Sequence, residues 1–149
     1  LFEAAGRLGA ILGDAGPEIE AALADYGTHL GTAFQLIDDV LDYSGQEAET
    51  GKHLGDDLAE GKPTLPLIHV IQHGTPQQAA LVRSAIENAS NDSFAEVLAA
   101  VRSSGALDEA RRHGVEEAGM AKAALAPLPE SKFRETLLQL ADFAVQRNF

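Results

Sequence analysis

The sequence predicts an all-α protein, and three observations support this prediction. Apolar residues recur three and four positions apart through most of the chain, which is the spacing of one helix face. Alanine, leucine and glutamate, which favour helices, are abundant. Prolines and glycines separate the periodic segments, and no segment shows the alternation of a β-strand. We therefore expect one helical domain over residues 1–149.

The first predicted helix starts at or before Leu1 and ends at the glycine-rich break over residues 13–16. The second runs from Pro17 to about Tyr43. Proline suits the first turn of a helix because its missing N–H has no partner there, and two glutamates follow near the positive end of the helix dipole.

Two stripes run along this second predicted helix. The apolar stripe comprises Ile19, Leu23, Tyr26, Leu30, Phe34, Ile37 and Leu41. The other stripe starts with small residues and ends with polar ones, and comprises Ala24, Gly27, Thr28, Gly31, Gln35, Asp38 and Asp42. Close packing of a neighbouring helix is the favoured interpretation of Gly27 and Gly31. A groove for an apolar ligand along the same stripe is a second, compatible interpretation.

From residue 44 to 61 the helical pattern lapses and glycines recur, so we expect a long loop, a kind of segment that is often functional. Further helices are predicted at about 63–74, 76–90, 92–103, 105–126 and 130–147. Thr75 and Gln78 have the spacing of a capping box at the start of one of them. The last predicted helix carries five residues at core spacing, which are Phe133, Leu137, Leu140, Ala141 and Ala144.

The composition excludes several classes of function. The net charge is −12, which argues against nucleic-acid binding. It also disfavours an anionic ligand unless metal ions or local lysines reverse the field. The chain has no cysteine and no apolar run that could span a bilayer, and we expect a cytoplasmic protein. Because it opens at Leu1 without a signal-like segment, we expect a piece of a longer protein.

Three carboxylates crowd the end of the second predicted helix. Asp38 and Asp42 are one turn apart and can present oxygens to one cavity, while Asp39 is rotated away. Mg²⁺ prefers oxygen ligands and bridges one or two carboxylates to substrate phosphates. Lys52 and Lys62, in the following loop, can then contact the remaining phosphate oxygens. A solvated acidic face is the alternative for an isolated motif, and the flanking residues favour a site.

Two segments of the chain resemble the second aspartate-rich region of trans-polyprenyl diphosphate synthases. They read FQLIDDVLD at 34–42 and GKHLGDDLAEGKPTLP at 51–66. The sequence AVQR at 144–147 resembles bacterial members that make octaprenyl diphosphate for quinone biosynthesis. The resemblance implies a homodimer and an all-helical bundle of the isoprenoid synthase type, of which this chain is the C-terminal half.

The resemblance also implies a reaction, in which a prenyltransferase adds isopentenyl diphosphate units to an allylic diphosphate such as farnesyl diphosphate. Mg²⁺ would assist departure of the allylic diphosphate, and the isopentenyl double bond would attack the resulting carbocation-like centre. The implied metal ligands are Asp38 directly, and Asp39, Asp42 and Asp56 through water. The implied substrate-binding residues are Lys52, Lys62, Phe34 and Gln35, with Asp38, Lys52 and Gln35 taking part in catalysis.

One departure from the family pattern bears on activity. The first aspartate-rich motif and a lysine-threonine pair expected just before Leu1 are absent, so we expect this chain alone to be inactive. Two alternatives remain open. One is a terpene cyclase or diphosphate hydrolase that uses the same metal chemistry. The other is a non-catalytic regulatory subunit, against which the presence of both Lys52 and Lys62 weighs.

Overall fold

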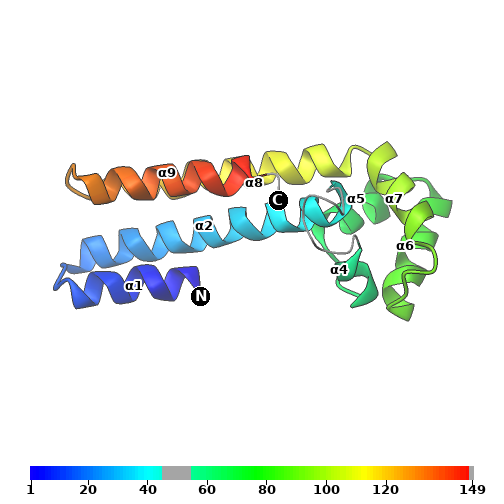
Figure 1. Cartoon of the computed structure of the whole chain (residues 1–149), viewed down its shortest axis with the longest axis horizontal. Coiled ribbons are helices and arrows are strands. Elements are labelled where there is room, and N and C mark those ends of the chain that lie inside the picture. Colours follow the sequence, from blue (N-terminus) through cyan, green and yellow to red (C-terminus); the bar gives the residue numbers. More distant parts are fainter. Residues whose placement is uncertain (45–54, 148–149) are drawn as a thin grey trace. The chain divides into compact units, whose positions relative to one another are not determined.

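The computed structural model describes residues 1–44 and 55–147, and Figure 1 shows their helices. The described residues contain no β-strand, so the prediction of an all-α protein is confirmed. They form two compact units. The first combines Leu1–Ile37 with His113–Arg147, and the second lies within Asp38–Arg112.

The first unit is built from four helical segments. They are α1 (Phe2–Leu12), the first part of α2 (Pro17–Ser44), the last part of α8 (Ala106–Ala124) and α9 (Lys132–Gln146). Its core comprises Tyr26, Leu30, Ala121, Leu125, Ala141 and Ala144. The buried Tyr26 hydroxyl donates a hydrogen bond of 2.8 Å to the carbonyl oxygen of Leu137, which joins α2 to α9. The core therefore satisfies the polar end of its largest side chain.

Glycines let α1 lie directly against α2, as the ribbons of Figure 1 also show. A Cβ atom at Gly27 would collide with the carbonyl oxygen of Phe2, and one at Gly6 would collide with the carbonyl oxygen of Leu23. At Gly31 a Cβ would lie 3.1 Å from the Phe2 side chain. The close-packing interpretation of Gly27 and Gly31 is therefore confirmed.

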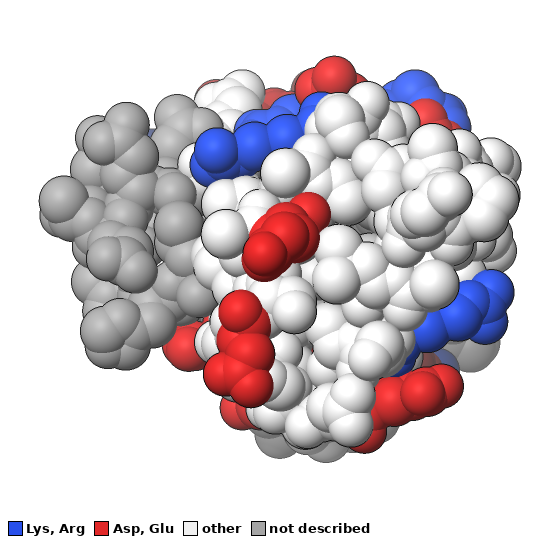
Figure 2. All heavy atoms as spheres, turned by 90° about the vertical axis from the view of Figure 1, so that its right-hand side faces the viewer, with Lys and Arg blue, Asp and Glu red and all other residues white. Residues whose placement is uncertain are grey.

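Among the described residues, the second unit contains the end of α2, the start of α8 and four helices between them. These are α4 (Asp56–Ala59), α5 (Leu65–His73), α6 (Pro76–Asn88) and α7 (Phe94–Ser103). The fully buried members of its core are Tyr43, Leu58, Leu67, Val70, Val82, Val97, Val101 and Ala106. Figure 2 shows the face at the α6 and α7 end, where the lysine and arginine side chains lie apart from one another.

Local sequence signals explain most helix boundaries. At the start of α6, Thr75 accepts a hydrogen bond from the Gln78 amide and the Gln78 side chain accepts one from the Thr75 amide, so the predicted capping box is confirmed. The helix predicted to end at about Tyr43 ends at Ser44. The prediction of a loop without helix over 44–61 is wrong at Asp56–Ala59, where α4 forms. Among the described helices, none is both long and apolar enough to span a bilayer.

Candidate functional site

The acidic turn, which we define as Asp38, Asp39 and Asp42, lies at the C-terminal end of α2. The Asp39 side chain is only 9% exposed, whereas Asp38 and Asp42 are half-buried. A carboxylate is costly to bury unless it is paired, because desolvation penalises its charged form. Each buried oxygen of this turn must therefore be compensated by its surroundings.

Lys62 provides that compensation for Asp39. Its ammonium nitrogen lies 3.3 Å from Asp39 Oδ1 and 3.0 Å from Asp57 Oδ1. Partial burial alone would lower the pKa of Lys62, but the hydrogen bonds and the attraction from Asp57 and Asp39 outweigh it, and its pKa lies above the ordinary value. The lysine is therefore held protonated between α2 and α4.

Asp42 has different surroundings. Its Oδ2 accepts a hydrogen bond of 3.3 Å from the Asp57 amide, and its carbonyl oxygen accepts one of 3.3 Å from the Gly55 amide. Burial raises the pKa of Asp42 to about 6, and repulsion from the carboxylates of Asp57 and Asp56 adds to the effect, while backbone hydrogen bonds oppose it. Binding of a proton or a cation would therefore stabilise the Asp42 carboxylate.

Whether this turn suits a metal can be judged from its donors. In the part of the chain that the structure describes, no three histidine or carboxylate side chains gather closely enough to hold an ion by themselves. Mg²⁺ does not require this, because it commonly uses one or two carboxylates and completes its shell with waters and phosphate oxygens. Asp38 and Asp42 fit that role as a partial ligand set.

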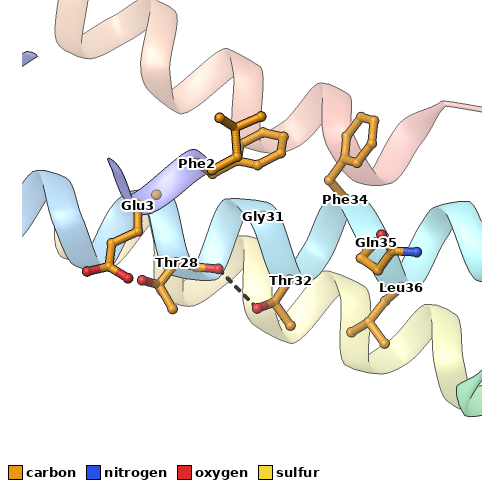
Figure 3. A pocket seen from close by; sticks show the side chains of 10 residues that line it. Phe2, Glu3, Thr28, Gly31, Thr32, Phe34, Gln35 and Leu36 are labelled. Atoms are coloured by element: carbon orange, nitrogen blue, oxygen red, sulfur yellow. Dashed lines mark hydrogen bonds between the residues drawn. The ribbon is translucent and has the colours of Figure 1, made fainter. Parts of the chain in front are cut away.

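A groove of about 610 Å³ lies in the first unit, along α2 and the start of α1. Figure 3 shows Thr28, Thr32, Gln35 and Leu36 along its length, with Phe2 and Phe34 beside them. The Thr32 hydroxyl donates to the Thr28 carbonyl oxygen at 3.0 Å, so it does not require a ligand. Apart from two glycines, the groove lining combines apolar and polar side chains, namely Leu1, Phe2, Phe34 and Leu36 with Glu3, Thr28, Thr32 and Gln35.

Phe34 is held in place by two residues that are distant in sequence. Its ring centroid lies 5.6 Å from that of Phe2. The Arg147 guanidinium lies 3.8 Å from the same centroid and donates a hydrogen bond of 2.7 Å to the Phe34 carbonyl oxygen. A cation over an aromatic face is attracted by the ring quadrupole. Arg147 was not among the predicted site residues, since 113 positions separate it from Phe34 and no local sequence pattern joins them.

The other predicted site residues are placed as follows. Asp56 is exposed at the first position of α4. Gln35 is exposed on α2 and lines the groove. Lys52 lies outside the described residues. The structure thus brings Lys62 to the acidic turn and adds Asp57, a residue that the predicted site had not included.

Comparison with known proteins identifies the family. The polyprenyl synthetase family model matches residues 1–102. Octaprenyl diphosphate synthase of Escherichia coli (strain K12) is 52% identical over 149 residues, covering 99% of this chain and 46% of the relative. All-trans-nonaprenyl-diphosphate synthase (geranyl-diphosphate specific) of Rhodobacter capsulatus is 43% identical, covering 99% and 45%.

Solved structures give the same result. A polyprenyl synthase from Caulobacter crescentus CB15, complexed with calcium and isoprenyl diphosphate, superimposes with a TM-score of 0.90 and is 42% identical, over 99% of this chain and 46% of that one. A geranylgeranyl pyrophosphate synthase from Corynebacterium glutamicum, complexed with isoprenyl diphosphate and magnesium, has a TM-score of 0.83 and 32% identity, over 94% and 41%. The chain therefore spans a little under half the length of these relatives.

Proposed function

Because this chain belongs to the polyprenyl synthetase family, we propose that it forms the C-terminal part of a prenyltransferase domain. The full-length enzyme adds isopentenyl diphosphate units to an allylic diphosphate and makes a long-chain product, octaprenyl diphosphate, for quinone biosynthesis. The chain alone is inactive in this proposal because half of the metal-binding apparatus is elsewhere. Homodimerisation belongs to the same proposal.

The observation that carries the proposal is the environment of Asp42. Its pKa is raised to about 6 by burial and by the neighbouring carboxylates of Asp57 and Asp56, so a bound cation would stabilise the charged form of Asp42 at neutral pH. Asp38 would hold Mg²⁺ directly, and Asp39, Asp42 and Asp56 would support it through water. When bound, the metal neutralises the diphosphate and makes it a better leaving group.

The roles of the other residues follow from their chemistry. Lys52 and the third N–H of Lys62 would hold oxygens of the allylic diphosphate as fixed positive charges. Phe34 and Gln35, which line the groove of the first unit, would line the reaction centre. In the reaction, the bond from this carbon to the diphosphate oxygen breaks. A new carbon–carbon bond forms to the isopentenyl double bond, and a proton is then lost.

Product analysis tests the proposal. The full-length protein is incubated with farnesyl and isopentenyl diphosphates and Mg²⁺, and products are separated by chain length. Elongated diphosphates are expected. Cyclised or merely hydrolysed farnesyl diphosphate would contradict elongation and support the cyclase or hydrolase alternative. Ligand binding with no product would support a regulatory subunit.

A further inference from the structure

We propose that Lys62 is a positioning residue for the metal-binding aspartates, acting through Asp39 and Asp57. This inference rests on the proposed function. The family resemblance implies only a substrate-binding role for Lys62, and the positioning role is additional. In this proposal Lys62 fastens α4 to the end of α2 and so fixes the geometry of the acidic turn. Its main effect is on metal affinity, and its effect on the allylic diphosphate is secondary.

We call the contacts of Lys62 with Asp39 and Asp57 the clasp, and their geometry supports this role. The ammonium of Lys62 bridges a side chain of α2 to a side chain of α4, at 3.3 Å and 3.0 Å. The Lys62 amide also donates a hydrogen bond of 2.9 Å to the Asp57 carbonyl oxygen. The side chain and the backbone amide of Lys62 thus both bind Asp57, and the described residues engage two of the three ammonium N–H groups.

The backbone around the clasp is tightly constrained. Gly55 and Gly61 flank α4 and both have left-handed φ angles, +85° and +68°. Leu58, within α4, is fully buried in the core of the second unit. The helix has only four residues, too few to be stable by their own hydrogen bonds, so it depends on its contacts with neighbouring elements.

Charge explains why the clasp matters for metal binding. Asp39 and Asp57 have exposed side-chain fractions of only 9% and 18%, so neither charge is well screened by water. Without the ammonium, these carboxylates and that of Asp42 repel one another, which drives α4 away from α2. The Asp57 amide that binds Asp42 Oδ2 moves with α4. The aspartates would then meet Mg²⁺ in a broader range of orientations.

The test compares three variants of the full-length protein: Lys62→Met, Lys62→Arg and Lys122→Met. Lys122 is the matched control, because it is equally exposed and is paired with a single carboxylate of Asp142 at 2.6 Å in the first unit. Hydrogen exchange of the peptide over residues 55–62 is measured without metal. Lys62→Met should speed this exchange at least tenfold, whereas Lys62→Arg should largely restore protection and Lys122→Met should leave it unchanged.

Manganese binding, followed by electron paramagnetic resonance, is the second readout and needs no turnover. Lys62→Met should weaken it about tenfold or more, and this loss should exceed the rise in KM for the allylic diphosphate at saturating Mg²⁺. Unchanged exchange and manganese affinity would overturn the positioning role, and so would a KM effect as large as the metal effect. If Lys62→Met fails to fold, Lys62→Met combined with Asp57→Asn removes both charges and is measured instead. An inactive wild-type enzyme refutes the proposed function without affecting these two readouts.

Discussion

Asp42 shows how one side chain can be unfavourable for stability and favourable for binding. Its ordinary pKa of 3.8 rises to about 6 in the folded chain, so the folded protein binds this proton more tightly than the unfolded protein does. The resulting stabilisation is present at low pH and is lost as the pH rises through about 6. At neutral pH the charged Asp42 therefore destabilises the metal-free fold.

Replacing this charge should stabilise the metal-free protein. In Asp42→Asn the amide oxygen can still accept the Asp57 hydrogen bond, but the charge is gone. After discounting for partial solvent exposure, we expect the free energy of unfolding to rise by ~1–2 kcal/mol at pH 7.5. This corresponds to a rise of about 2–6 °C in Tm. The gain should vanish near pH 4.

Thermal melts of wild type and variant at both pH values check this prediction. Asp25→Asn is the matched control, since Asp25 is exposed on the same helix. A variant less stable than wild type at pH 7.5 would contradict the electrostatic account of Asp42.

At the residue scale, the sequence predicts the acidic turn but not its partners. The D-D-x-x-D spacing alone places Asp38 and Asp42 on one face of a helix. That Lys62 pairs with both Asp39 and Asp57 depends on the path of the chain between α2 and α4. Side-chain pairing of this kind has no periodic signal in the sequence.

At the scale of elements, α4 depends on a glycine with two constraints. Gly55 has φ +85°, and a Cβ there would lie 2.5 Å from the ring of Phe94. Gly105 has φ +76° with no atom within 4 Å of the same position. Substitutions at the two positions can therefore be compared to separate the cost of a left-handed backbone from the cost of a steric clash.

Alanine at these two positions should therefore have unequal effects. Gly105→Ala should cost only the conformational strain, ~1–2 kcal/mol. Gly55→Ala should cost ~1–3 kcal/mol more, because the Phe94 ring must move within a packed core. Urea unfolding of the full-length variants measures both. Equal losses would contradict the tight contact between Gly55 and Phe94.

The contact between α1 and α2 gives a second prediction at this scale. Gly27→Ala should destabilise by ~1–3 kcal/mol, because the new Cβ forces α1 away from α2. Gly9→Ala, on the exposed side of α1 with no atom nearby, should stabilise by up to ~1 kcal/mol through helix propensity. The same unfolding measurement applies, and a neutral Gly27→Ala would contradict the close approach of the two helices.

Helices with strong local signals were predictable, and α4 was not. The proline at the start of α2 and the capping box of α6 identify those helices directly. Four residues are too short to show a 3.6-residue period, and α4 forms because Leu58 is buried and Asp57 binds Asp42 and Lys62. The stability of α4 comes from tertiary contacts, which a local sequence pattern does not reveal.

At the scale of the whole molecule, charge and apolar surface are the relevant quantities. In the last helix, the prediction of a core position is confirmed for Ala141 and Ala144, which are buried. It is wrong for Phe133 and Leu140, which are 83% and 44% exposed. Periodicity identifies an apolar face without showing which element covers it. The net charge of −12 still predicts a barrier to anionic ligands, which metal ions or local lysines would have to overcome.

In the proposed function, the acidic turn captures a magnesium-bound diphosphate. Binding of an unreactive farnesyl thiodiphosphate to the full-length protein, with and without Mg²⁺, tests it most directly. We expect Mg²⁺ to tighten binding by at least a hundredfold, and Asp38→Ala to remove most of this gain, while Asp25→Ala behaves as wild type. Equal affinity with and without Mg²⁺, or unaltered binding by Asp38→Ala, would contradict the claim.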